Sequence, residues 1–373
     1  MMNKTRNINL NQLMTLMILF LIGGSALAST GRYSGQDVWI VILVGGAIGA
    51  LLFTMYLRIS KLHDYKEFPT ILKSCFGKYL GICLTFIYAG FFLFRTFSIG
   101  NFMSTMAQQT LMYGASTRLV ITLLLATVIF ASIHGLTSIS RSSEIFFIII
   151  IICLLPFLMS VFTNGTFKTA NLVPVLAEGF PRIGQDISRI VFFPFGELVV
   201  FLMIFPYMKK SENKQILKRG YIAISIAVLL MIAIDLTTVA LIGASLTSSF
   251  EYSFFNAMQL AGMNGLLERL DPLAVVIMVV SEYFKLVLFF FSTLLAIQAL
   301  NKKFEFKYIL ILISFIIFIF APLVNFEQLD FLLETMPFKI LPIFELVIPV
   351  IILIISEIKH RKQKKSAHTE QLT

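Results

Sequence analysis

Long apolar runs, separated by short polar segments, follow one another along almost the whole chain. Ten of these runs approach the length of about 20 residues that a helix needs to cross the hydrocarbon core of a bilayer. The expected spans are residues 10–29, 38–57, 79–102, 119–133, 143–162, 188–207, 221–242, 273–300, 308–323 and 338–358. The pattern therefore predicts an all-α polytopic membrane protein with ten transmembrane helices.

Two of the expected spans contain residues that interrupt a helix. These residues are Gly23, Gly24, Ser25 and Ala26 in the first span, and Phe193, Pro194, Phe195, Gly196 and Glu197 in the sixth. Proline removes a backbone donor, glycine loosens a helix, and a charge that faces lipid is costly. Irregular backbone at membrane depth is tolerated only where it is buried in protein or lines a cavity. The two interruptions therefore indicate a transporter-like core with a small-solute site between them.

Composition and charge agree with a membrane protein and predict its orientation. The chain of 373 residues is 58% hydrophobic and 13% charged, more apolar than a soluble domain can bury. One set of alternate loops and termini holds 21 of the 30 Lys and Arg residues, and the opposite set holds seven. The positive-inside rule therefore places both termini of this multi-pass protein in the cytoplasm. The same bias explains the net charge of +10, so we expect no nucleic-acid partner.

The first span also imitates a secretory signal, because Lys4 and Arg6 precede it and Ala26-Leu27-Ala28 resembles a cleavage site. We favour an uncleaved helix, since ten spans then divide into two inverted halves in which the interrupted first and sixth spans correspond. No soluble domain is expected, because the loops at 59–78 and 164–187 are short. The expected organisation is a single permease-like domain, 1–358, followed by a basic, disordered cytoplasmic tail, 359–373, that contacts anionic lipid. Repeat one would cover about 9–162 and repeat two about 183–358.

Five ionisable side chains within the spans attract attention, namely Arg95, Glu197, Asp235, Glu282 and Lys285. Such residues face the interior of a helical bundle, where they pair or act. Glu282 and Lys285 are three residues apart on one helix face and can neutralise each other, while Arg95 can pair with Glu197. Asp235 lies nearer the end of its span, where access to water can explain it.

Glu197 is the strongest candidate for function because it directly follows an interruption. It can contact a ligand or cap the freed amides of a new helix start, and the two roles are compatible. The glycines of the first span can expose main-chain groups to a ligand, or form a notch for a neighbouring helix. We expect a small zwitterionic or polar nutrient between the interruptions, with its carboxylate near the amides of residues 23–25 and its amine near Glu197 or the freed carbonyls of the sixth helix. The expected walls of this pocket are Ser98, Phe193 and Phe195.

Motifs of catalysis and cofactor binding are absent from the sequence. It contains no G-x-x-x-x-G-K-[ST], no H-E-x-x-H, no G-x-S-x-G and no cysteine–histidine metal spacing. Cys75, Cys83 and Cys153 are too few and too scattered for a disulfide framework. We therefore expect no enzyme activity, no ATP-driven pumping, no cofactor and no metal.

Three segments around the sixth span resemble a known family. They are Asn171-Leu172-Val173-Pro174-Val175-Leu176 before it, Pro194-Phe195-Gly196-Glu197 within it, and Phe205-Pro206-Tyr207 at its end. With the length, the ten spans and the basic tail, they make the chain similar to the B subunits of spore germinant receptors, the endospore germination permeases. That family resembles the amino acid–polyamine–organocation transporters, which implies a five-plus-five inverted fold with discontinuous first and sixth helices.

The resemblance implies a nutrient-sensing subunit that binds a small germinant, such as an amino acid or a sugar, and triggers germination. It implies a place in the inner membrane of a spore, or in a bacterial cell membrane, beside an A subunit and a lipoprotein C subunit. A secondary amino-acid transporter would keep the same interruptions, and a water or ion pathway is a third alternative.

The same resemblance bears on coupling ions. In transporters of this fold the eighth helix faces the first interruption, and some members hold sodium there. Because Lys285 lies on the eighth expected span, its ammonium group would occupy the place of that cation. We therefore expect sodium-independent binding, with Lys285 and Glu197 contributing to the two-state bias that a ligand shifts.

Overall fold

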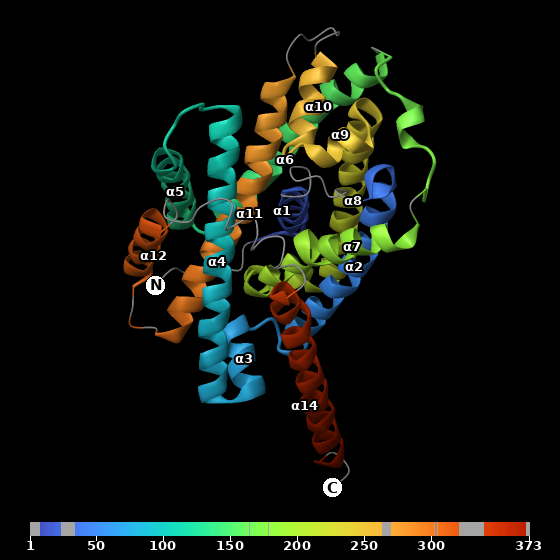
Figure 1. Ribbon diagram of the computed structural model, residues 1–373. Helices are drawn as coiled ribbons and strands as arrows, with labels where there is room; N and C mark the ends of the chain where they lie inside the picture. The colour runs from blue at the N-terminus through green and yellow to red at the C-terminus, as the bar shows by residue number, and fades with distance from the viewer. Residues whose placement is uncertain are drawn as a thin grey trace.

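The computed structural model describes residues 8–23, 34–163, 165–177, 179–262, 270–301, 303, 305–320 and 339–370. Their regular secondary structure is helical, and these residues form no strand beyond an isolated bridge between Ile8 and Met208. The helices stand beside one another in a bundle, from which α14 projects at one end (Figure 1). The predicted all-α class is confirmed.

The first part of the chain is built from long helices. It contains α1 (Leu10–Ile22), η1 (Gly35–Asp37), α2 (Val38–Leu62), α3 (Phe68–Phe76), α4 (Lys78–Thr110), α5 (Thr117–His134) and α6 (Leu136–Thr163). The second part is more broken. It contains η2 (Thr169–Leu172), α7 (Phe180–Ile190), η3 (Val191–Phe195), η4 (Gly196–Met203), η5 (Phe205–Tyr207), η6 (Lys210–Gln215), α8 (Ile216–Ile242), α9 (Ala244–Ser249), α10 (Ser253–Gly262), α11 (Asp271–Leu300), α12 (Phe306–Phe320), η8 (Ile343–Val347) and α14 (Ile348–Glu370).

Six of the described helices are long and apolar enough to cross a membrane. They are Gly35–Leu62, Lys78–Thr110, Thr117–His134, Leu136–Phe162, Lys210–Ile242 and Asp271–Leu300, which correspond to the second to fifth, seventh and eighth expected spans. Two shorter apolar helices, Leu10–Ile22 and Phe306–Phe320, lie within the first and ninth expected spans. The chain is therefore a multi-pass membrane protein, while the count of ten spans and the inverted repeat stay predictions.

Short helices occupy segments that the sequence analysis left between spans. α3 lies in the expected loop at 59–78, and α9 and α10 fall between the seventh and eighth expected spans. All three are too short to cross a bilayer, so a search for membrane-length apolar runs passes over them. α3 lies close against α4 because Gly81 has no side chain; a Cβ there would lie 2.7 Å from the backbone nitrogen of Lys73.

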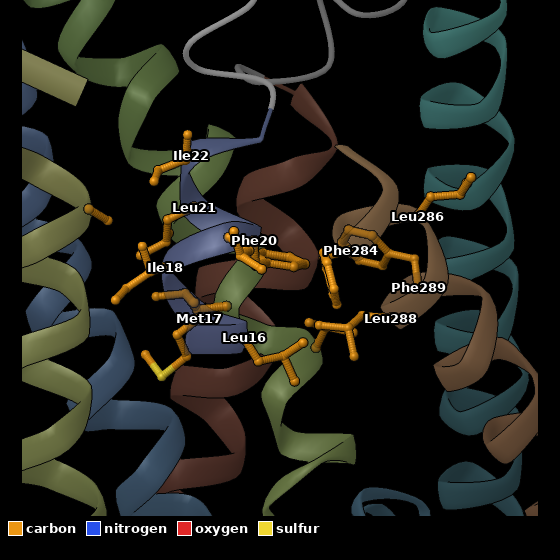
Figure 2. Close-up of a cluster of buried hydrophobic side chains, with 14 of the residues drawn as sticks. Leu16, Met17, Ile18, Phe20, Leu21, Ile22, Phe284, Leu286, Leu288 and Phe289 are labelled. Atoms are coloured by element: carbon orange, nitrogen blue, oxygen red, sulfur yellow. The ribbon is translucent and has the colours of Figure 1, made fainter. Parts of the chain in front are cut away.

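α1 lies at the centre of the bundle and contacts α6, α8 and α11. Every residue from Leu16 to Ile22 is 0% exposed, as expected for a short helix that is apolar on all its faces. Phe20 points toward α11, where its ring centroid lies 5.6 Å from that of Phe289 (Figure 2). This contact fixes the end of α1 beside the middle of α11, where the candidate site lies.

The basic tail continues α14 as helix as far as Glu370 and is not the disordered segment that the sequence favoured. Lys, Arg, Gln and Ala are good helix formers, and a helix already formed in the apolar part extends without a new nucleation step. An ion pair of 2.7 Å between Arg58 on α2 and Glu357 joins α14 to the bundle.

Candidate functional site

The sixth expected span is interrupted at the predicted place. α7 ends at Ile190, and the next five residues form the π-helical segment η3, in which Phe193 has the non-helical angles φ −134° and ψ 103°. A new short helix, η4, begins at Gly196. Pro194 supplies no N–H and forces the residue before it out of the helical region, so the regular hydrogen-bond pattern cannot continue. The prediction of non-helical backbone beside Pro194 is confirmed.

The first expected span is also interrupted, at the one residue of its four-residue break that the structure describes. α1 ends at Ile22, and Gly23 leaves the helix with ψ 134°. A Cβ at Gly23 would lie 2.8 Å from the carbonyl oxygen of Ser281, so this glycine allows α1 to touch the backbone of α11. Gly23 thus forms a packing notch, one of the two alternatives, and its contact with a ligand stays a prediction. Gly24, Ser25 and Ala26 lie outside the described residues.

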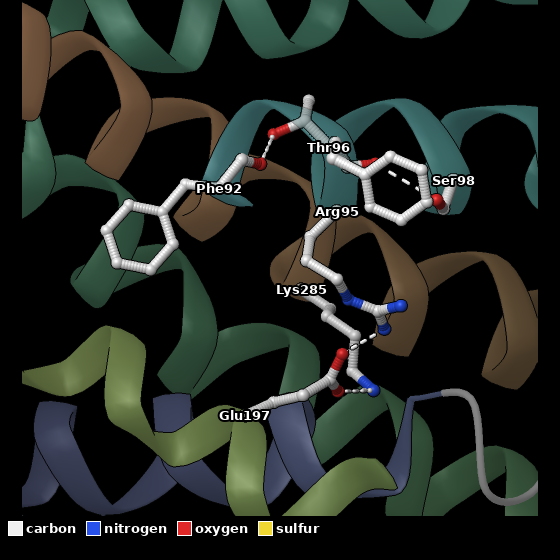
Figure 3. A network of polar contacts seen from close by, with 7 residues as sticks. Phe92, Arg95, Thr96, Ser98, Glu197 and Lys285 are labelled. Atoms are coloured by element: carbon white, nitrogen blue, oxygen red, sulfur yellow. Dashed lines mark hydrogen bonds and ion pairs between the residues drawn. The ribbon is translucent and has the colours of Figure 1, made fainter. Parts of the chain in front are cut away.

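A buried ion-pair cluster lies directly after the interruption in the sixth span. Arg95 on α4 donates from Nη2 to Oε1 of Glu197, and Lys285 on α11 donates from Nζ to Oε2 at 2.8 Å (Figure 3). The side chains of Glu197 and Lys285 are 0% exposed and that of Arg95 is 1% exposed. The three residues therefore tie η4 to two long helices through charges that water does not screen.

This arrangement answers two questions that the sequence left open. The expected Arg95–Glu197 pair is present, whereas Lys285 reaches across to Glu197 instead of only neutralising Glu282 on its own helix. Glu197 does not occupy the N-cap position of η4, which is Phe195, but lies inside that helix. Both of its carboxylate oxygens serve the two basic side chains.

Phe193 covers the cluster with an aromatic face. Its ring centroid lies 4.3 Å from Nζ of Lys285 and 5.3 Å from the guanidinium carbon of Arg95. Phe20 lies 5.4 Å from Nζ of Lys285, and Phe289 lies 5.8 Å from the guanidinium carbon of Arg95. Desolvated cation–π contacts of this kind contribute about 2 kcal/mol each. The interruption thus places Phe193, an expected wall residue, against both cations.

Other expected site residues lie elsewhere or have local partners. Phe195 is fully buried against α2, where a Cβ at Gly49 would lie 2.6 Å from its ring. Ser98 is buried on α4 and donates to the carbonyl oxygen of Phe94 at 3.0 Å. Asp235 is buried within α8, and Glu282 lies one turn before Lys285 on α11 and is 2% exposed.

The sequence analysis missed another buried carboxyl beside the interruption, that of Glu345. It lies in the π-helical segment η8, is 0% exposed, and packs against the broken helix so closely that a Cβ at Gly196 would collide with its Oε2. Tyr56 on α2 donates to the carbonyl oxygens of both Gly196 and Glu345, and so joins η8 to η4. An acidic residue inside the tenth expected span was the available signal. Among the described residues, no group of His, Cys, Asp and Glu is arranged to hold a metal ion.

A helical bundle with a broken sixth span, buried from Pro194 to Phe205, and with charges gathered behind the break defines a transporter-like membrane protein. Its fold is similar to that of Mhp1, a nucleobase-cation-symport-1 family transporter solved in a closed conformation with bromovinylhydantoin bound. The TM-score is 0.61 at 15% identity, and the match covers 88% of this chain and 74% of that one.

The chain belongs to the family of spore germination proteins, whose family model matches residues 7–329. It is 26% identical to spore germination protein KB of Bacillus subtilis (strain 168), over 99% of both chains. It is also 22% identical to spore germination protein YndE, over 98% of this chain and all of the relative, and 25% identical to spore germination protein A2, over 79% of each, both from the same organism. The suspected resemblance is therefore confirmed.

Proposed function

We propose that the protein is the nutrient-sensing membrane subunit of a spore germinant receptor, which binds a small zwitterionic germinant such as an amino acid and so triggers germination. The observation that carries this proposal is the buried cluster of Arg95, Glu197 and Lys285 beside the interrupted sixth span, in a chain of the spore germination family. Charges buried in a membrane protein mark a functional site by default, and broken helices supply main-chain partners for a solute.

The charges of the cluster suit a zwitterion. Arg95 and Lys285 are two basic residues, Glu197 and Glu282 are two acidic ones, and all four side chains are buried. A site whose charges balance favours a ligand without net charge over an anion or a cation, because an uncompensated charge at this depth is costly.

Binding proceeds by exchange of partners, because both oxygens of Glu197 already accept hydrogen bonds. The ligand carboxylate replaces one of these oxygens as acceptor from Arg95 or Lys285, and the oxygen that is released accepts from the ligand ammonium group. The exchange loosens the tie between η4 and the two long helices. A ligand that favours the loosened state shifts the protein toward it, which is the conformational signal.

The proposed setting follows the family. The subunit lies in the inner membrane of the spore with both termini in the cytoplasm, and it passes its conformational change to an A subunit and a lipoprotein C subunit.

A secondary amino-acid transporter of the same fold is the second candidate. It is favoured by the similarity to a transporter that was solved with a small molecule bound, and by interruptions in both the first and the sixth expected spans. In this alternative the same exchange at Glu197 is followed by opening toward the other side of the membrane.

The two functions separate in proteoliposomes that contain the protein with and without the partner subunits. The probe is a mixture of radiolabelled amino acids, and both retention on the protein and uptake into the lumen are measured. Retention without uptake supports the receptor, and uptake supports the transporter. The Glu197→Gln variant should abolish either signal, whereas Glu357→Gln, which changes a partly exposed carboxylate on α14, should change neither. If the parent protein shows neither retention nor uptake, the proposal is overturned.

A further inference from the structure

Glu345 carries a carboxyl in the interior of the bundle for which the described part of the chain supplies no hydrogen-bond partner. The residue is 0% exposed, and neither Oε1 nor Oε2 has a hydrogen-bond partner among the described residues. Glu197, a few side chains away across the break, has one basic partner for each oxygen. An ionised carboxylate buried without a partner is strongly disfavoured, so such a group neutralises itself by binding a proton.

The titratable groups that face Glu345 are engaged elsewhere. From α2, Tyr56 gives its hydroxyl hydrogen to the backbone carbonyls of Gly196 and Glu345, and from α4, Tyr88 gives its own to the carbonyl of Phe344 at 2.8 Å. The remaining facing groups are Arg95 on α4, Glu197 on η4 and Lys285 on α11, whose charges act on Glu345 from a distance while their ion pairs are made with one another. The described part of the chain therefore leaves no facing group to neutralise the carboxylate of Glu345.

On the side of Gly196, the carboxyl of Glu345 packs against the backbone of the broken helix. A Cβ at Gly196 would lie 3.0 Å from Cδ of Glu345 and would collide with Oε2, so the carboxyl rests directly on the glycine. The carbonyl oxygen of Val191 lies 3.2 Å from the same Cβ position, so an acceptor for a carboxylic O–H is close by.

We propose that Glu345 is a proton-binding site at the broken sixth span, occupied when η8 rests on Gly196 and emptied when the two segments separate. On separation the O–H bond of the carboxyl breaks, the proton passes to water, and the carboxylate is hydrated. Tyr56 couples the separation of η8 from Gly196 to the release of the proton, because the backbone carbonyls of Gly196 and Glu345 share the hydroxyl of that tyrosine. This site is distinct from the proposed nutrient site. Its proton binding does not depend on which ligand the nutrient site takes.

The proton is tested directly by infrared spectroscopy of the full-length protein in lipid nanodiscs at neutral pH. A protonated carboxylic acid has a carbonyl stretch that is separate from the carboxylate bands and shifts in D2O. We expect this band in the parent protein and its loss in Glu345→Gln, with no change in the control Glu357→Gln. A parent spectrum without the band, or a band that persists in Glu345→Gln, would overturn the proposal. Glu345→Met serves the same comparison if the amide variant does not fold.

The coupling is tested by hydrogen–deuterium exchange of the peptide that covers η3 and η4, corrected for the intrinsic effect of pH. Over about pH 5 to 9, where buried carboxyls titrate, exchange in the parent protein should accelerate with pH as Glu345 loses its proton. In Glu345→Gln the rate should be independent of pH. Tyr56→Phe should keep the infrared band and weaken the dependence on pH. A flat profile in the parent, or an unchanged slope in Glu345→Gln, contradicts the coupling.

Discussion

Substitutions in the cluster around Glu197 should lower the free energy of unfolding by unequal amounts, because Glu197 pairs with two cations and Lys285 pairs with one anion. Glu197→Gln keeps the shape of the side chain but breaks both ion pairs and leaves Arg95 and Lys285 buried without an anion between them. Removal of one partner from a buried ion pair costs about 3–5 kcal/mol. We expect the free energy of unfolding of Glu197→Gln to fall by at least that amount.

Lys285→Met breaks only the 2.8 Å contact, and Glu197 keeps Arg95. The lost hydrogen bond between charged groups is worth about 1.5–3 kcal/mol. Part of this loss is offset because the ammonium group no longer has to be desolvated, and Met fills the space beside Phe193 and Phe20. The expected cost is therefore below about 3 kcal/mol and smaller than that of Glu197→Gln.

The double variant Glu197→Gln, Lys285→Met sharpens the prediction. It breaks the same two ion pairs as Glu197→Gln alone and removes one of the two repelling cations. The double variant should therefore lose no more unfolding free energy than Glu197→Gln alone. Its loss should be smaller than the sum of the two single losses by about 1–3 kcal/mol.

The assay is unfolding of the purified protein in mixed micelles by increasing detergent denaturant, followed by circular dichroism, with Glu357→Gln as the control. The reasoning is refuted if Lys285→Met is as damaging as Glu197→Gln, or if the two changes add. Either result would mean that the carboxylate does not hold both cations together.

Three further predictions concern other parts of the molecule. Gly49→Ala should destabilise the protein by about 1–3 kcal/mol through overpacking against Phe195, whereas Gly90→Ala on α4, where a Cβ meets nothing within 4 Å, should be neutral or stabilising in the same unfolding assay. Burial, with Lys66 and Lys359 nearby, lowers the pKa of His63 below 6.5, so the neutral ring is favoured in the folded state. The thermal midpoint should therefore fall as pH drops below about 6.5, and His63→Gln should remove that part of the dependence. Germination in sodium-free medium should match that in sodium, and a strict requirement for sodium would refute the assignment of Lys285 as the resident cation.

The sequence predicts the interruption of the sixth span correctly because its cause is local. Pro194 removes a donor from its own turn and restricts Phe193, and neither effect depends on the rest of the fold. The end of α1 at Gly23 follows from the same kind of local signal. The pairing of Arg95 with Glu197 was predicted from charge balance alone, since two charges buried at similar depth need each other.

The parts that the sequence did not reveal depend on contacts between distant segments. The spacing of Glu282 and Lys285 favours a pair within one helix, and only the approach of η4 to α11 offers Lys285 a partner at 2.8 Å. Phe195 is next to the break in sequence, yet it packs on α2 because Gly49 leaves room for its ring. Glu345 has no basic residue at a helical spacing in the sequence that would draw attention to it. Its contact with Gly196, which is far away in the chain, is formed only by the fold.

Gly196 is the point at which the two proposed sites meet. Its neighbour Glu197 carries both ion pairs, its carbonyl accepts from Tyr56, and its Cα face supports the carboxyl of Glu345. A ligand that draws Glu197 toward itself therefore moves Gly196, and the movement removes the surface on which the protonated carboxyl rests. If ligand binding releases the proton of Glu345, linkage requires that loss of the proton favours ligand binding by the same free energy. Ligand affinity must then rise with pH in the parent protein and lose that slope in Glu345→Gln. A nutrient sensor built in this way would respond to its ligand and to alkalinity through the displacement of one glycine.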